Sequence, residues 1–383
     1  MQVQKDIMEE FLSSVYILSH SKSTVSTYRL SIVNKKKTGF CDFLNQKYNI
    51  DEFSLVEKIK NQEMDVYKIL KEFVIFLDVS KYQPKSIKTR LAAVKGYLRH
   101  LGVKIYTEDC KHSIRLPKVV ARREEPMTKE MLVRLLRNVT PKLQTAILVA
   151  ISTGMRIGEL VQLEVRDIDF DTKPVKIRIR AETTKTREER ETFLTEEATN
   201  SLKDYLKRFY DWKEDKNEHL KNQIIFGRTS LSKHQIREDS QLKRGYFLTS
   251  ENLLQKMLST SIKKIPDLSR NNENGRKVIH FHAFRKYFRT VVGNACGRDF
   301  AEAIIGHKFY LSTYYNLSEA QKKELYLKAE PYLTISDYAK IEHTIQNLTE
   351  KYRDLEKKYE EFRKYASTNS ISHSHLENDN SLI

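Results

Sequence analysis

Several residue types are scarce in this chain of 383 residues, and each scarcity excludes a class of protein. The three cysteines lie far apart without metal-ligand spacing, which argues against a disulfide scaffold and predicts free thiols in a reducing compartment. Glycine and proline number only 11 and 7, so we expect helices with short connections and disfavour an all-β fold. No apolar run has the length of a transmembrane helix, and the amphipathic N-terminus does not resemble a signal peptide.

Positive charge is what the chain has in excess. Its 68 Lys and Arg residues against 51 Asp and Glu residues give a formal net charge of +17. Basic side chains release counterions when they neutralise phosphates, so this balance favours a polyanionic partner such as DNA, RNA or an anionic membrane. Because no membrane span is expected, we predict a cytoplasmic, nucleoid-associated protein.

The first 110 residues predict a domain of short helices. A helix that starts near Pro84 has apolar residues at three- and four-residue steps, which is the spacing of one buried face. Its opposite face carries the basic residues Lys85, Lys88, Arg90, Lys95 and Arg99. A face of this kind is either solvated or lies along DNA, and the net charge of the chain makes the two about equally credible.

Residues 111–126 interrupt the helical pattern and predict a linker between two domains. The second domain, residues 127–335, begins with a helix that Thr128 is expected to cap. An apolar helix over residues 142–151 is expected to be buried, and Gly154 predicts a tight turn at its end.

The hydrophobic period changes further along this domain. Val175, Ile177 and Ile179 alternate with basic residues, which predicts a strand with one buried face. A polar stretch and a returning strand follow, so we expect a hairpin with Lys185 in its turn, where a lysine alone would usually be solvated. The predicted fold class is mainly α with a small β-hairpin or sheet.

The C-terminal residues 336–366 show a heptad pattern, with apolar residues at alternating four- and three-residue steps. These residues are Ile341, Ile345, Leu348, Tyr352, Leu355, Tyr359 and Phe362. The pattern predicts a coiled-coil helix, although one long helix that packs on its own domain would show it too. Residues 367–383 are rich in Ser, Asn and His and are predicted to be disordered.

Five short motifs follow one another in the second domain. They are Thr153–Leu160 (TGMRIGEL), Thr184–Thr186 (TKT), His282–Arg285 (HAFR), Ile305–His307 (IGH) and Tyr314–Tyr315. Each motif is weak by itself, since a lone histidine is usually a core residue and Arg156 could simply pair with Glu159. In this order, on a basic chain, they resemble the tyrosine recombinases of the phage-integrase and Xer type. The last part of the domain, YYNLSEAQKKELYLKAEPYLTI, is similar to archaeal members.

The resemblance covers residues 128–335, and the N-terminal helices match the core-binding domain of the family only in character. It implies an α+β catalytic domain that breaks and rejoins DNA through a tyrosine. A helix such as the one predicted after residue 318 commonly docks on a neighbouring protomer in this family. Double-stranded DNA and a homo-oligomer, with a tetrameric synapse, are the implied partners, and no cofactor is implied.

The implied site residues suit phosphoryl transfer. Arg156 and Arg285 would hold the non-bridging oxygens through bidentate hydrogen bonds. Lys185 would give a proton to the departing 5′-oxygen, His282 would act as a base or phosphate contact, and His307 would donate a further hydrogen bond. The product would be a 3′-phosphotyrosine, formed without a metal ion or ATP.

The nucleophile is expected in the tyrosine pair. In family members the nucleophilic tyrosine usually stands at the position that corresponds here to Asn316. If the loop after His307 is one residue shorter in this chain, Tyr315 takes the position of the nucleophile. Tyr314 is the close alternative and Tyr310 a distant one. We therefore predict a site-specific recombinase or integrase; a type IB topoisomerase and a catalytically silent DNA-binding regulator are the alternatives.

Overall fold

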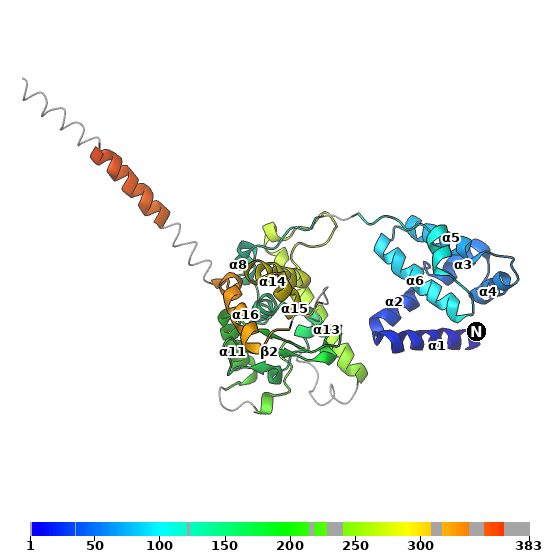
Figure 1. Cartoon of the computed structure of the whole chain (residues 1–383), viewed down its shortest axis with the longest axis horizontal. Helices are drawn as coiled ribbons and strands as arrows, with labels where there is room; N and C mark the ends of the chain where they lie inside the picture. The colour runs from blue at the N-terminus through cyan, green and yellow to red at the C-terminus, as the bar shows by residue number, and fades with distance from the viewer. Residues whose placement is uncertain are drawn as a thin grey trace, which may run out of the picture. The chain divides into compact units, whose positions relative to one another are not determined.

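The computed structural model describes residues 2–34, 36–120, 123–213, 218–227, 240–307, 316–336 and 348–363. The chain divides into two compact units, Met1–Ala121 and Arg122–Ile383. Helices dominate both units and the second also holds a small sheet (Figure 1), so the predicted fold class is confirmed.

The first unit is helical. Its helices are α1 (Gln2–Ser19), α2 (Lys22–Ile32), α3 (Phe40–Tyr48), α4 (Glu52–Lys60), α5 (Val66–Val79), α6 (Pro84–His100) and α7 (Thr107–Ser113). Asp51 and Asp65 cap α4 and α5 by accepting hydrogen bonds from backbone N–H groups of the first turn. Phe40, Phe43 and Phe73 stack within the core that α3, α5 and α6 share. The apolar face predicted for α6 is therefore buried.

Helix α7 extends into the range that the sequence analysis assigned to a linker. The chain stays helical to Ser113, and Cys110 and Ile114 are 7% and 8% exposed in the core of the first unit. The predicted linker, residues 111–126, thus overlaps the last residues of α7. A helix of seven residues with two apolar contacts gives too short a periodic signal to detect.

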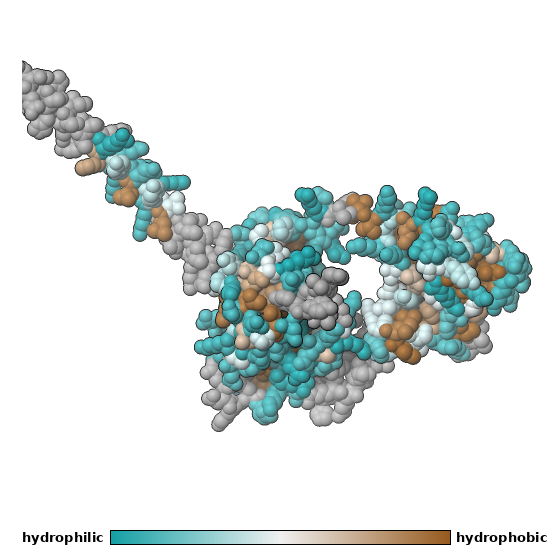
Figure 2. Space-filling view, in the orientation of Figure 1, coloured by the Kyte–Doolittle hydropathy of each residue, from teal (hydrophilic) through white to brown (hydrophobic). Residues whose placement is uncertain are grey.

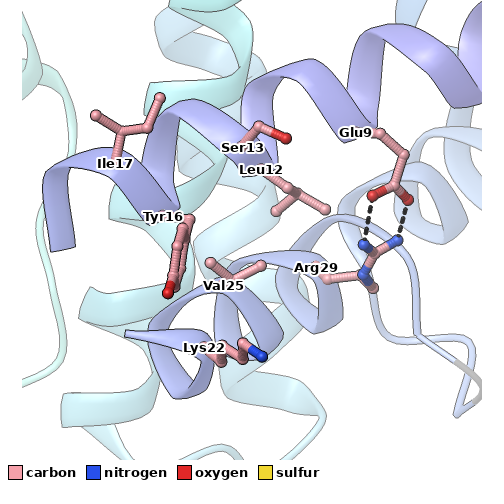
Figure 3. Close-up of a pocket in the computed structure, with 8 residues that line it drawn as sticks. All are labelled: Glu9, Leu12, Ser13, Tyr16, Ile17, Lys22, Val25 and Arg29. Carbon is pink, nitrogen blue, oxygen red and sulfur yellow. Dashed lines mark hydrogen bonds and ion pairs between the residues drawn. The ribbon is translucent and has the colours of Figure 1, made fainter. Parts of the chain in front are cut away.

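A cavity of about 320 Å³ lies between α1 and α2 in the first unit. Figure 3 shows Glu9 on α1 and Arg29 on α2 joined by two hydrogen bonds at one end of it, with lengths of 2.5 and 2.7 Å. Tyr16 and Ile17 lie toward its other end, with side chains that are 41% and 67% exposed. Helix α1 packs on α2 and α6, and the ion pair between Glu9 and Arg29 adds a contact between α1 and α2 at the surface.

The second unit contains the remaining elements. Its helices are α8 (Lys129–Leu136), α9 (Pro141–Thr153), α10 (Ile157–Leu160), α11 (Glu196–Tyr210), α13 (Ser240–Lys263), α14 (Phe281–Cys296), α15 (Arg298–Ile305) and α16 (Glu319–Leu333). Short 3-10 turns are η1 (Val165–Asp167), η2 (Ala181–Thr183), η3 (Glu218–Leu220) and η4 (Pro266–Leu268). The strands are β1 (Ile168–Asp169), β2 (Lys176–Ile179) and β3 (Arg190–Phe193).

The core of the second unit forms around the buried helix α9, which the sequence predicted. Thr128 caps α8 as expected, accepting a hydrogen bond from the N–H of Met131. Helices α9, α15 and α16 all pack against α14, which lies among them in Figure 1. Because α14 carries two of the predicted site residues, its contacts determine where that site lies.

The sheet is antiparallel in the order β1-β2-β3. Strands β2 and β3 form the predicted hairpin, with Ile177 opposite Thr192 and Ile179 opposite Arg190. Ile177 and Ile179 are buried, as their alternation with basic residues indicated. Strand β1 was not predicted, because two residues carry no measurable alternation.

Helix α16 packs within its own chain. The side chain of Tyr326 is fully buried, and its hydroxyl donates to the carbonyl of Ser152 at 2.8 Å. The docking of this helix on a neighbouring protomer, which the family resemblance implied, stays a prediction. Tyr326 of α16 is buried against α9 within the same chain, because the two helices belong to one core.

Residues 348–363 form a separate helix in which all the apolar side chains are exposed. It is the red-orange helix in Figure 1, and Figure 2 shows hydrophobic side chains on its surface among hydrophilic ones. The other heptad positions, Ile341 and Ile345, and the predicted disordered tail lie outside the described residues.

Candidate active site

The turn after α9 places the first candidate arginine. Gly154 ends the helix with a φ of +64°, in the left-handed region that favours glycine. A Cβ atom there would lie 2.4 Å from Cδ1 of Phe288 on α14 and 2.8 Å from Cγ2 of Ile305 on α15. The backbone can therefore approach both helices closely, and it delivers Arg156 to the start of α10.

Arg156 shares a buried carboxylate with a second arginine. Its backbone N–H donates to Oε2 of Glu159 at 2.8 Å, and its Nη1 donates to Oε1 at 2.9 Å. The same carboxylate, 2% exposed, accepts from Nη1 and Nη2 of Arg190 at 3.1 and 2.5 Å. Burial would raise the pKa of Glu159, but the pairs with Arg190 and Arg156 outweigh it and the pKa is lowered. The predicted contact of Arg156 with Glu159 is present.

Arg285, in the motif HAFR, connects the motifs TGMRIGEL and IGH from a buried position. Its side chain is 2% exposed, with Nη1 donating to the carbonyl of Gly154 at 2.5 Å and Nη2 to that of Ile305 at 2.7 Å. Burial, with the nearby charges of Arg156 and Arg190, lowers the pKa of Arg285 to about 9, so it stays charged at neutral pH. Its Nε is buried and has no hydrogen-bond acceptor among the described residues.

His307 follows the left-handed Gly306 that ends α15. Its Nδ1 lies 2.7 Å from Oε2 of Glu302, and Oε1 of Glu302 accepts from Nε of Arg289 at 2.8 Å. Desolvation opposes ionisation of Glu302, but Arg289 and His307 outweigh it and lower its pKa. The carboxylate thus holds one ring nitrogen of His307, which leaves the other available to a phosphate.

His282 and Lys185 are less enclosed. His282 is the second residue of α14 and is exposed, one helical turn from Arg285. Desolvation, followed by the charges of Lys286, His280 and Arg285, lowers the pKa of His282 from its ordinary 6.5, while Glu124 opposes the shift. Lys185 is exposed in the turn between β2 and β3, as predicted.

The described residues on either side of the tyrosine segment lie near Arg190, since Gly306 contacts its side chain and Asn316 shares a cavity with it. Tyr310, Tyr314 and Tyr315 are outside the described residues. The chain leaves the described part at His307 and resumes at Asn316, which lines a cavity of about 200 Å³ together with Arg190.

The basic residues predicted to contact DNA on α6 fall into two groups. Lys85 and Lys88 are exposed and Lys95 is partly exposed. Arg90 donates to the carbonyl of Leu30 and stacks over the ring of Tyr82 at 4.2 Å. Arg99 donates to the carbonyl of Ile105 at 2.8 Å. Both arginines thus also stabilise the first unit, which their position on a basic face did not indicate.

Two site residues were missed by the sequence analysis. Arg190 begins β3 and Glu302 lies on α15, and neither belongs to the five motifs. The only sequence signal for Arg190 is its position at the start of a strand of the hairpin. The only signal for Glu302 is its position five residues before His307. Their roles depend on contacts across the fold that no local pattern records.

The comparison with known families agrees with this geometry. The model of the phage integrase family matches residues 125–321, which contain all five motifs. The chain belongs to this family, the tyrosine recombinases.

Individual relatives are distant. Tyrosine recombinase XerA of Saccharolobus solfataricus is 24% identical over 210 residues, which are 53% of this chain and 64% of that protein, less than two thirds of its length. A crystal structure of XerA recombinase is 19% identical with a TM-score of 0.36, over 85% of this chain and 98% of the other. A lambda integrase (75–356) dimer bound to a COC′ core site is 16% identical with a TM-score of 0.48, over 82% and 98%.

Two further findings concern what the site and the chain contain. Within the described ranges, no group of three or more His, Cys, Asp or Glu residues is placed to hold a metal ion. A search of the same ranges finds no helix with both the length and the apolar character that a membrane crossing requires.

Proposed function

We propose that this chain is a site-specific DNA recombinase or integrase that breaks and rejoins DNA through a 3′-phosphotyrosyl intermediate. The observation that carries the proposal is the pair of hydrogen bonds from Arg285 to the carbonyls of Gly154 and Ile305. Those carbonyls lie two residues before Arg156 and two before His307. Arg156, Arg285 and His307 can each bind a phosphate, and these hydrogen bonds hold together the segments that carry them.

In the proposed reaction, Arg156, Arg285 and His307 bind the non-bridging oxygens of one phosphodiester. The tyrosine oxygen forms a bond to phosphorus while the bond to the 5′-oxygen breaks. Lys185 gives a proton to the departing 5′-oxygen, and His282 accepts the phenol proton. The phosphotyrosyl bond conserves the energy of the ester, so a second 5′-hydroxyl can reverse the step without ATP or a metal ion.

Tyr315 is the proposed nucleophile, with Tyr314 as the alternative. Support comes from the covalent neighbour of Tyr315, because Asn316 lines a cavity with Arg190.

His282 gives the proposal a dependence on pH. Because the pKa of His282 is lowered, the ring is neutral at pH 7 and able to accept a proton. We expect the acidic limb of the single-turnover cleavage rate to lie below pH 6.5, the ordinary pKa of histidine. Lys286→Met removes a positive charge near His282 and frees Glu124 from its ion pair. Both changes raise the pKa of His282, so the acidic limb should move to higher pH.

The control is Arg276→Met, which removes another basic neighbour of Glu124. We expect its limb to stay close to that of the unaltered chain, and His282→Gln to lose the limb. A limb that moves to lower pH in Lys286→Met contradicts the role of His282 as the base.

The N-terminal unit is proposed as a core-binding domain over residues 1–110, in which Lys85, Lys88 and Lys95 contact phosphates together with Arg90 and Arg99. The exposed lysines of α6 and the net charge of +17 support this part. Residues 127–335 would hold the chemistry, and a tetramer on DNA would bring two duplexes together.

We also propose that the helix at residues 348–363 pairs with a second copy of itself. Its seam is formed by Leu348, Tyr352, Leu355, Tyr359 and Phe362, whose side chains are 60–69% exposed. A parallel pair places Lys351 of one helix beside Glu356 of the other. The same rule places Lys358 beside Arg363, so the parallel pair has one attractive and one repulsive type of contact. An antiparallel pair would place Lys351 beside Lys358, a repulsive contact with no attractive one to offset it, so the charges favour the parallel arrangement.

Leu355→Lys is expected to disrupt this pairing, because it places a charge in the middle of the apolar seam. The full chain without DNA would then fall to monomer mass in light scattering. Glu350→Lys, on the outer face of the same helix, is the control and should keep the larger mass. A monomeric unaltered chain at micromolar concentration would rule the pairing out.

Incubation with supercoiled plasmids, with and without paired candidate sites, tests the function itself. Sequence-specific joining with a trapped protein–DNA adduct supports recombination. Relaxation without joining would assign a topoisomerase, and binding without an adduct would assign a silent regulator.

A further inference from the structure

Arg190 is the most enclosed arginine of the candidate site to which the mechanism above gives no task. Its side chain is 9% exposed, although it lies at the start of β3 beside a hairpin turn. Arginine is seldom buried unless it is paired, and both of its partners are parts of the site.

The first partner is Glu159. Each oxygen of this carboxylate bonds to Arg190, and each also bonds to Arg156, one through the backbone N–H and one through Nη1. The three side chains carry two positive charges and one negative, which leaves a net positive charge near the proposed phosphate position. Without Arg190, the charges of Glu159 and Arg156 would cancel, and the buried carboxylate would keep only Arg156 as a hydrogen-bonded cation among the described residues.

The second partner is the turn that carries His307. Gly306 has a φ of +70°, and a Cβ atom there would lie 2.8 Å from Cδ of Arg190 and 3.1 Å from its Nε. The stem of Arg190 therefore lies directly against the backbone of Gly306. The side chain of Arg190 thus contacts Glu159, which binds Arg156, and Gly306, which precedes His307. Arg156 and His307 are far apart in the sequence.

Resting on the proposed function, we propose that Arg190 is a positioning residue. It neutralises Glu159, so that Arg156 remains free to bind the phosphate, and it holds the turn before His307 in place. This role requires no contact of Arg190 with DNA or with the reacting atoms.

The test measures the rate at which the full chain forms the covalent adduct in a single turnover at saturating DNA. We expect Arg190→Met to slow this step by about 10²-fold, the effect of losing one oriented donor to a transition-state oxyanion. The dissociation constant for DNA should change much less. Arg178→Met is the matched control, because Arg178 lies on the paired strand β2 in an exposed ion pair with Glu189.

A double substitution separates this role from a purely structural one. If Arg190 acts by neutralising Glu159, then Glu159→Gln in the Arg190→Met background removes the unpaired carboxylate and restores part of the rate. Loss of packing alone would make the double variant as slow as the single one, or slower, and would overturn the proposal. Arg190→Lys, which keeps one charge and is the safer variant for folding, should be intermediate in rate.

The outcomes also separate this inference from the proposed function. An unaltered chain that forms no adduct on any candidate DNA refutes the function. An active unaltered chain in which Arg190→Met is as fast as Arg178→Met refutes only the role of Arg190.

Discussion

Tyr315→Phe is expected to abolish the covalent protein–DNA adduct while leaving DNA binding intact. Phenylalanine has the ring of tyrosine without the oxygen that attacks phosphorus, so the loss should reach at least about three orders of magnitude in cleavage rate. The measurement is adduct formation on a nicked or suicide DNA site, read by the shift in protein mass on a denaturing gel. Binding is followed on the same DNA by mobility shift.

Tyr314→Phe is the matched control, since it removes the adjacent hydroxyl from the same segment. We expect it to retain adduct formation, because an aromatic ring at this position can keep its packing. Loss of the adduct in Tyr314→Phe but not in Tyr315→Phe would assign the nucleophile to Tyr314. Loss in Tyr310→Phe alone would move it to the third candidate.

Gly154→Ala is expected to cause the largest loss of stability. The new side chain would have to adopt a φ of +64° and would place its Cβ atom 2.4 Å from Phe288, within a packed core. A left-handed backbone and overpacking together cost about 2 to 5 kcal/mol of the free energy of unfolding. The single tryptophan, Trp212, is 4% exposed in the second unit, so its fluorescence during urea unfolding reports on that unit alone.

Gly275→Ala provides the comparison for this measurement. Gly275 has a φ of +78° with no atom within 4 Å of the added Cβ, so only the backbone term applies, about 1 to 2 kcal/mol. A loss in Gly154→Ala no larger than that in Gly275→Ala would show that Phe288 and Ile305 move aside easily.

Local patterns in the sequence predicted much of this fold. The buried helix α9, the turn at Gly154, the cap at Thr128 and the hairpin around Lys185 all depend on neighbours within a few residues. The order of the five motifs predicted the family, because it combines many weak signals along one chain. The sequence did not predict α7, because this helix is too short to show a period and its burial depends on α5.

The candidate site was harder to predict in detail. The hydrogen bond from Arg285 to Gly154 joins residues 131 positions apart, and the pair of Arg190 and Glu159 spans 31. Such contacts depend on how α9, α14 and β3 pack, which periodicity does not specify. For the same reason the sequence suggested only a basic face on α6, whereas Arg90 and Arg99 also bond to the backbone of their own unit.

The anchoring of α16 has a consequence for the segment that carries the tyrosines. This segment begins after His307, held by Glu302, and ends before Leu317, which packs on the main core ahead of α16. A chain fixed at both ends behaves as a short closed loop, whose effective concentration at a nearby point is far higher than that of a free tail. Under the proposed function, residues added between His307 and Asn316 would therefore lower the effective concentration of the tyrosine hydroxyl at the phosphate, while Arg156, Arg190 and Arg285 stay unchanged.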